Sequence, residues 1–195
     1  MIIEPVILYG KIVKLVPLQK RHVLELAEAG SDEEIWKYMP YGPIVTLEKM
    51  SDLIDHLLTL QDHKTDLPFA VIYQNSGKVI GMTRFIGIEP ANRGLEIGGT
   101  WYTRDYQHTM VNTECKFLLL RHAFEDLNCI RVQFKTDVRN ERSQRALERI
   151  GAVKEGILRD HMILPDGTVR SSVYYSILAG EWIAVKQHFL YLMSR

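Results

Sequence analysis

Residues 94–127 read GLEIGGTWYTRDYQHTMVNTECKFLLLRHAFEDL and contain three patterns in succession. The first is a strand-like segment, about 94–102, that includes the pair Gly98-Gly99. A polar loop follows at 105–113, and then a helix that is apolar on most of its surface. Glycines inside a strand cost stability and often mark a bulge or a close approach of the backbone to a ligand. The pair therefore indicates either a bulge that only shapes the sheet or a ligand site.

The polar loop also has two readings. The free N–H groups and the dipole of a helix N-terminus suit a phosphate group. Every helix has such a terminus, however, and this loop contains no glycine that would let the backbone approach an anion closely. The residues alone leave open whether the loop binds an anion or is only a helix start.

A second helix is predicted by NERSQRALERIG, residues 140–151, in which Asn140 is a suitable N-cap and Gly151 a suitable end. Asn140 and Ser143 lie three positions apart on the first turn, so their side chains are neighbours. With Arg142 and Arg145 they could hold the amide and phosphate groups of a long anionic cofactor. The alternative is that Asn140 only caps the helix and that the arginines form surface pairs of the Glu141–Arg145 kind.

The rest of the chain predicts further strands and helices around these segments. Hairpin turns are indicated by Asn75-Ser76-Gly77 and Pro165-Asp166-Gly167. The elements form an antiparallel meander, a crossover helix, a strand, a helix and a hairpin. This order predicts the α+β (mixed α/β) class, with a mixed sheet flanked by helices, and one domain over 1–195. Strands are predicted at 6–16 (with a break at Gly10), 69–73, 78–85, 130–136, 153–164 and 168–178, and helices at 20–30, 31–39, 46–62 and 181–193.

Composition excludes several classes of protein. The chain has 195 residues, 46% of them hydrophobic, and 24 basic residues balance 24 acidic ones. A net charge of zero argues against a nucleic-acid or membrane-surface role. No uncharged run approaches the roughly 18 residues of a membrane span, and no signal peptide is recognised. The two cysteines, Cys115 and Cys129, form no CxxC motif, which favours a reduced cytoplasmic protein without disulfides or a metal site.

Several of these motifs together resemble the GNAT superfamily of N-acetyltransferases, and more narrowly its ribosomal-protein N-acetyltransferase-like (RimJ/RimL-type) branch. The resemblance covers about residues 10–182 and is carried by WY at 101–102, by 106–125, by 130–178 and by EW at 181–182. It implies the GNAT fold, with a central mixed, mostly antiparallel sheet flanked by helices. It also implies acetyl-CoA as the donor and an amine as the acceptor.

The resemblance assigns the cofactor-binding residues by position. In this family the pantetheine chain pairs with the strand that matches 98–102, and the pyrophosphate lies over the loop that matches 107–112. This chain departs from the family's Gln/Arg-x-x-Gly-x-Gly/Ala loop pattern, because Met110 and Asn112 occupy the two small-residue positions. The predicted contacts to acetyl-CoA are Gly99, Thr100, Trp101, Tyr102, Gln107, His108, Thr109, Met110, Val111, Asn112, Asn140 and Ser143.

Acetyl transfer requires a neutral amine, a stabilised oxyanion and a proton for the thiolate. Glu96, just before the glycine pair, is the predicted base, with a structural ion pair as its alternative. Ser143 could protonate the thiolate, or only bind the cofactor, and Tyr102 is a second candidate acid. A backbone N–H near 99–101 is the expected oxyanion donor. His108 and His161 could also titrate near neutrality, although a satisfied or surface histidine is commoner.

Two alternatives to an acetyltransferase stay open at this point. One is a non-catalytic acyl-CoA-binding sensor or interaction module on the same fold, suggested by Met110 and Asn112. The other is an α/β binding domain unrelated to CoA. Covalent transfer through Cys115 is rejected, because the family implies direct transfer and the residue starts a strongly apolar helix. The predicted partners are acetyl-CoA and an amine acceptor, without nucleic acid or membrane, and a homodimer is compatible with this prediction.

Overall fold

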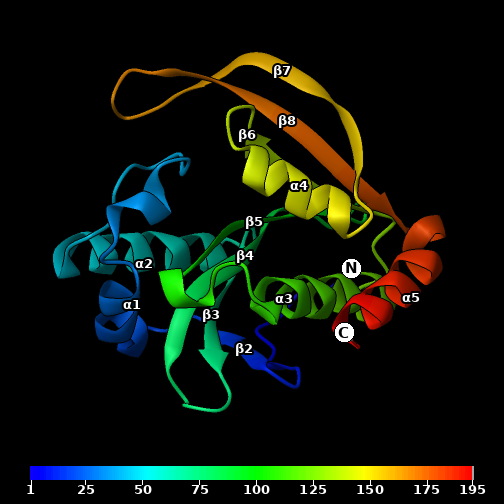
Figure 1. Ribbon diagram of the computed structural model, residues 1–195, viewed down its shortest axis with the longest axis horizontal. Coiled ribbons are helices and arrows are strands. Elements are labelled where there is room, and N and C mark those ends of the chain that lie inside the picture. The colour runs from blue at the N-terminus through cyan, green and yellow to red at the C-terminus, as the bar shows by residue number, and fades with distance from the viewer. Residues whose placement is uncertain (195) are drawn as a thin grey trace.

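The computed structural model describes residues 1–194, and its strands form one twisted sheet in the order β1-β2-β3-β4-β5-β6-β8-β7 (Figure 1). Neighbouring strands are antiparallel except for β5 and β6, which are parallel. The predicted mixed, mostly antiparallel sheet is therefore confirmed. The strands are β1 Leu8–Tyr9, β2 Val13–Pro17, β3 Leu67–Tyr73, β4 Val79–Glu89, β5 Gly94–Tyr102, β6 Arg131–Asp137, β7 Val153–Ile163 and β8 Val169–Leu178.

The helices follow the predicted segments, with one correction at 31–39. That segment contains only a short 3-10 helix, Glu33–Trp36, whose N-cap Asp32 accepts a hydrogen bond from the N–H of Glu34. Within residues 1–194, every helix falls short of the length and apolar character that crossing a bilayer requires. The α-helices are α1 Val23–Ala29, α2 Leu47–Asp62, α3 Met110–Arg121, α4 Glu141–Arg149 and α5 Trp182–Met193.

The helices cover both faces of the sheet and bury a core on each. The α1/α2 face has a cluster that includes Met82 and Trp101, while the α3/α5 face has a larger cluster that includes Phe85 and Ile97. Successive residues of a strand face opposite sides, so a single apolar strand contributes to both cores. This arrangement explains why β4 and β5 are buried over most of their length.

A buried carboxylate attaches α3 to the start of the sheet. Glu114 on α3 accepts hydrogen bonds from the backbone N–H groups of Lys11, Ile12 and Val13 at 2.7, 2.8 and 2.8 Å. A side chain at Gly10 would meet this carboxylate, because a Cβ there would lie 2.5 Å from Glu114 Cδ. These contacts hold α3 against the start of β2, and α3 also carries residues of the candidate site.

Candidate active site

The site begins where β5 and β6 separate. Their parallel register runs from Gly94 opposite Arg131 to Glu96 opposite Gln133, and no register pair joins the two strands beyond that point within residues 1–194. Both strands nevertheless continue, β5 to Tyr102 and β6 to Asp137. Their facing edges therefore carry backbone groups that do not pair with one another. An extended ligand can use such unpaired strand edges for hydrogen bonds.

The glycine pair lies in this open part of β5 and forms a bulge. Gly99 has a φ of +56°, and the register of β4 with β5 shifts at this place. A Cβ at Gly99 would approach Arg84 Nε to 2.9 Å, and one at Gly98 would approach Glu96 Oε1 to 3.0 Å. The predicted bulge is confirmed. Because Gly98 has no side chain, the Glu96 carboxylate can occupy the space beside it. Contact between this strand and a cofactor stays a prediction.

Glu96 itself is buried at the last paired position. Its carboxylate lies 3.4 Å from Gln133 Nε2 and 3.6 Å from Lys135 Nζ, both on β6. The carboxylate is thus held between an amide and an ammonium group beside the opening. This geometry fits both readings, a base with two fixed neighbours and a structural ion pair.

Two more titratable groups, His161 of β7 and Tyr174 of β8, lie on the same side of the sheet as Glu96. His161 Nδ1 lies 3.1 Å from Ser172 Oγ, and its Nε2 lies 3.5 Å from the hydroxyl of Tyr174. Burial, with Lys135 and Arg170, lowers the pKa of His161, so its imidazole is neutral at pH 7. Burial and the nearby Glu96 raise the pKa of Tyr174, which keeps its hydroxyl protonated.

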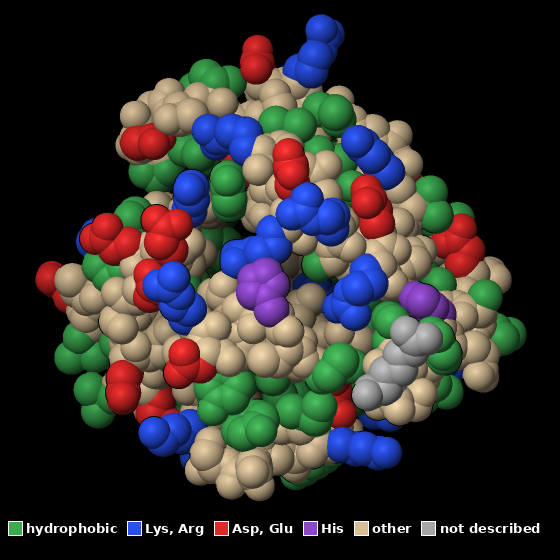
Figure 2. Space-filling view, in the orientation of Figure 1, with side chains coloured by type: hydrophobic (Ala, Val, Ile, Leu, Met, Phe, Trp, Pro, Cys, Tyr) green, Lys and Arg blue, Asp and Glu red, His purple; other side chains and the backbone are tan. Residues whose placement is uncertain are grey.

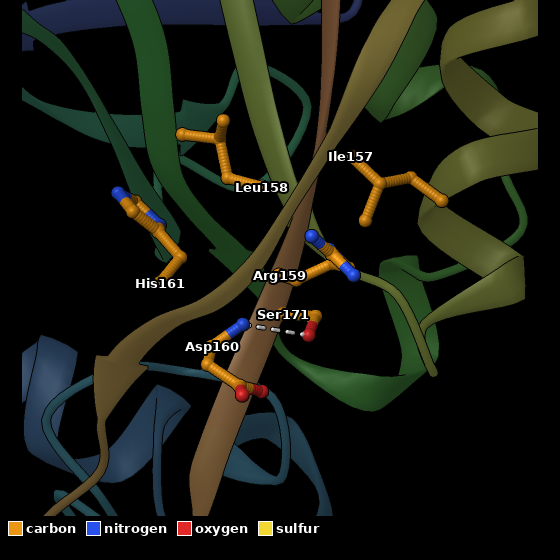
Figure 3. Close-up of a pocket in the computed structure, with 6 residues that line it drawn as sticks. All are labelled: Ile157, Leu158, Arg159, Asp160, His161 and Ser171. Carbon is orange, nitrogen blue, oxygen red and sulfur yellow. Dashed lines mark hydrogen bonds between the residues drawn. The ribbon is translucent and has the colours of Figure 1, made fainter.

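His161 borders a hollow along the β7–β8 hairpin. Figure 3 shows His161 and Ile157 pointing to opposite sides of the hairpin. Their side chains point to opposite sides because the register of β7 with β8 shifts between Leu158 and Met162. Within this irregular segment Asp160 has a φ of +49° and donates its N–H to Ser171 Oγ at 3.0 Å. The lining residues are Ile157, Leu158, Arg159, Asp160, His161 and Ser171.

The loop before α3 is fixed at both ends. Gln107 donates from Nε2 to the carbonyl of Tyr102 at 3.0 Å, and its Oε1 accepts from Arg142 Nη1 at 2.7 Å. His108 has a φ of +60°. The hydroxyl of Thr109 caps α3 by accepting from the N–H of Val111 at 3.2 Å. The other N–H groups of the first turn have no partner within the helix.

The start of α4 stands opposite this loop. Asn140 Oδ1 accepts from the N–H of Ser143 at 3.0 Å, so Asn140 does cap the helix. Its amide nitrogen donates to no acceptor within residues 1–194, and the bond from Arg142 to Gln107 joins the two helix starts. Figure 2 shows Lys and Arg side chains and a histidine gathered around a hollow between the parts of the view where Figure 1 draws α3 and α4.

The side chains of several predicted cofactor residues are buried in the protein. Trp101 packs on Trp36 with ring centroids 4.9 Å apart. Tyr102 is buried and donates its hydroxyl to Asn112 Oδ1 at 3.3 Å, and burial raises its pKa well above the ordinary value. Val111 is also buried. An acid role for Tyr102 therefore stays a prediction, with its hydroxyl directed toward α3.

Sequence reasoning missed three polar residues beside the opening: Lys116, Lys135 and Tyr174. Lys135 could have been found, because Gln133 and Lys135 alternate with apolar residues along β6 and so share a face. Lys116 gives no such signal, since it lies in the middle of an apolar helix. Among residues 1–194, no group of three His, Cys, Asp or Glu side chains is arranged to hold a metal ion.

Comparison with known proteins agrees with this geometry. Residues 13–153 match the family model described as an acetyltransferase (GNAT) domain, so the chain belongs to the GNAT acetyltransferases. The resemblance to the GNAT N-acetyltransferases stated from the sequence is thereby confirmed.

Individual relatives give the same class. A protein named putative ribosomal N-acetyltransferase YdaF from Bacillus subtilis is 35% identical over 106 residues, which are 54% of this chain and 57% of YdaF. A putative acetyltransferase structure from T. thermophilus is 38% identical, with a TM-score of 0.87 and 97% of both chains covered. RimJ from Mycobacterium smegmatis, described in complex with CoA-disulfide, shares the fold at 20% identity, with a TM-score of 0.81, 98% of this chain covered and 94% of RimJ.

Proposed function

We propose that the chain transfers an acetyl group from acetyl-CoA to a primary amine, either a protein N-terminus or a small-molecule amine, directly within a ternary complex. The observation that carries this proposal is the separation of β5 from β6 immediately beyond the buried Glu96. An extended pantetheine chain could pair with the open edge of β5 at 98–102. Its pyrophosphate would then reach the start of α3, and the amide and hydroxyl of Asn140 and Ser143 would lie beside it.

The residues at the opening supply the chemistry of amine attack. Glu96 accepts a proton from the amine, and Lys135 and Gln133 orient its carboxylate. An α-amino group, with a pKa near 8, is about one-tenth neutral at pH 7, whereas a lysine side chain is neutral to a few parts in ten thousand. A protein N-terminus, or another amine of similarly low pKa, is therefore the acceptor class that Glu96 can deprotonate most easily. The name of YdaF, putative ribosomal N-acetyltransferase, is consistent with such an acceptor.

Two measurements test this function. Calorimetry should show that the chain binds acetyl-CoA, and a thiol-release assay over a panel of N-terminal peptides, free amino acids, polyamines and amino sugars should show turnover with at least one amine. Binding without turnover on the whole panel would favour the alternative, a non-catalytic acyl-CoA-binding module. Absence of binding at millimolar acetyl-CoA would contradict both.

Three further sequence predictions stay predictions: a single domain over 1–195, a cytoplasmic location and a homodimer. Cys115 and Cys129 are free and buried. Burial raises the pKa of Cys115 to about 12, which leaves its thiol protonated and agrees with the rejection of a covalent route.

A further inference from the structure

Lys116 is a buried cation directed at the opening between β5 and β6. The residue is 6% exposed. Its Nζ donates to Thr100 Oγ1, on the open part of β5, at 2.9 Å, and lies 5.6 Å from the centre of the Phe134 ring on β6. The ammonium group therefore contacts side chains of both strands from the α3 side, beyond the last register pair of β5 with β6.

Within residues 1–194 no ion pair offsets the charge of this ammonium group, and its contacts are those with Thr100 and the Phe134 ring. A buried ammonium group is costly unless it is paired, and no carboxylate oxygen lies within 4 Å of Lys116 Nζ in residues 1–194. Thr100 is its only hydrogen-bond partner in that part of the chain, although an ammonium group has three donors. Thr100 in turn shares a hydrogen bond with Thr83 at 2.8 Å. The site thus holds a fixed positive charge with unused donors.

Lys116 and Glu96 approach the opening from opposite faces of the sheet. Glu96 contacts Gln133 and Lys135, which face the α1/α2 side. Phe134, beside Lys116, faces the other way and belongs to the α3/α5 core. A thioester lying in the opening could therefore contact the Glu96 carboxylate and the Lys116 ammonium group at the same time.

We propose that the Lys116 ammonium group donates a hydrogen bond to the carbonyl oxygen of the acetyl thioester and stabilises the oxyanion that forms there. This inference rests on the proposed function, because it needs acetyl-CoA in the opening. It adds a side-chain donor to the backbone N–H groups near 99–101 expected for the oxyanion.

The reaction then proceeds with Lys116 keeping its proton throughout. The amine nitrogen attacks the carbonyl carbon and loses its proton to Glu96, and the C=O π electrons move onto the oxygen that accepts the hydrogen bond from Lys116. The oxyanion collapses, the C–S bond breaks and the electron pair leaves on the CoA sulfur. The proton lost by the amine passes by way of Glu96 to the thiolate. A donor fixed before the reaction begins stabilises the developing charge without reorganisation.

The acid–base behaviour of Lys116 is compatible with this role. Burial lowers its pKa from 10.5 to about 8, so the ammonium form predominates at pH 7. Activity that depends on this form should decline as the pH rises through about 8. A base role for Lys116 would give the opposite trend, because the neutral amine would then be required.

The test uses acetyl-CoA labelled isotopically at the acetyl carbonyl, bound to the full chain and observed by difference infrared spectroscopy. A hydrogen bond from Lys116 lowers the carbonyl stretching frequency, so the band should move to higher frequency in Lys116→Met than in the wild type. Arg121→Met removes a charge from the same helix without touching the opening and should leave the band unchanged. Turnover of Lys116→Met should fall by about 10²–10³-fold, while its affinity for CoA changes little.

Four results would overturn the inference. An identical carbonyl band in the wild type and Lys116→Met, with both proteins folded and saturated with acetyl-CoA, would exclude the hydrogen bond. Turnover of Lys116→Met equal to that of the wild type would exclude a role in the reaction. Wild-type activity that increases through pH 8, with loss of that increase in Lys116→Met, would identify a base instead. Failure of the wild type to bind acetyl-CoA would overturn the inference together with the proposed function and is recognised separately by calorimetry.

Discussion

Glu96 of β5 and Gln133 of β6 form the last parallel register pair before the two strands separate, and the Gln133 amide nitrogen lies 3.4 Å from the Glu96 carboxylate. The pairing that ends the parallel ladder therefore also places a buried carboxylate at the edge of the opening. Lys135, two residues further along β6, lies 3.6 Å from the same carboxylate. The end of the parallel pairing therefore determines where the proposed base and its two polar neighbours lie.

The first prediction concerns Glu96 as the base. Glu96→Gln keeps the size of the side chain but removes its ability to accept a proton, so turnover should fall by about 10²–10⁴-fold while CoA affinity stays nearly unchanged. Steady-state thiol release and calorimetry measure the two quantities. Glu155→Gln, which removes a carboxylate that pairs with Arg131 elsewhere on the sheet, is the control and should retain turnover. If Glu96→Gln loses stability but keeps its specific activity, the residue is a structural ion pair.

The second prediction concerns the backbone of the loop before α3. Met110 is the first residue of α3, a position where proline is well tolerated because its missing N–H has no helical partner. Met110→Pro should therefore fold normally but lose one donor to the pyrophosphate. A hydrogen bond to a charged group contributes about 1.5–3 kcal/mol, so CoA should bind roughly ten- to a hundredfold more weakly.

Met110→Ala is the matched control, since it shortens the side chain and keeps the N–H. Binding of pantetheine compounds without the pyrophosphate should be equal in the two variants. Equal CoA affinity of Met110→Pro and Met110→Ala would mean that this N–H does not bind phosphate.

The third prediction separates the two roles of Asn140. Asn140→Ala removes the cap on the Ser143 N–H and should cost about 1 kcal/mol of folding free energy. Asn140→Asp keeps a good capping oxygen but replaces the amide donor with a negative charge, so stability should be retained and CoA affinity should fall. Denaturant unfolding and calorimetry on both variants distinguish the effects. Wild-type CoA affinity in Asn140→Asp would restrict the residue to capping.

The fourth prediction follows from the burial of Lys116 and does not depend on any activity. Below pH 8 Lys116 is protonated in both the folded and the unfolded chain, so the full penalty of burying its charge is present. As the pH rises from about 8 toward 10.5, the folded chain loses this proton before the unfolded chain does, and the penalty is relieved.

Lys116→Met should therefore be more stable than the wild type at pH 7, by up to roughly 3 kcal/mol if the pKa difference is fully expressed. The advantage should shrink toward pH 10. Urea unfolding of both proteins at the two pH values gives the comparison. A constant difference across this range would show that Lys116 titrates normally in the folded chain.

Local patterns were sufficient to predict most of the secondary structure. The alternation in β6, the turn at Asn75-Ser76-Gly77 and the cap at Asn140 all depend on neighbours within a few positions. The glycine pair predicted a bulge for a similarly local reason, since Gly99 adopts a positive φ. The segment 31–39 was predicted incorrectly as a helix. Its apolar residues Ile35 and Trp36 are buried by the tertiary structure within a short 3-10 helix.

By itself, the sequence determined the elements, their approximate order in a mixed sheet, the resemblance to GNAT acetyltransferases and the position of Glu96 before the bulge. Only the tertiary structure decided what surrounds the opening. Whether a strand residue faces the ligand or the core depends on where the pairing of β5 with β6 stops, and those strands are separated in the chain by the whole of α3. Lys116 shows the physical reason most clearly. Burying a charge is unfavourable, so sequence reasoning expects a lysine to be exposed. The packing of α3 beneath the separated strands instead places its ammonium group between Thr100 and Phe134.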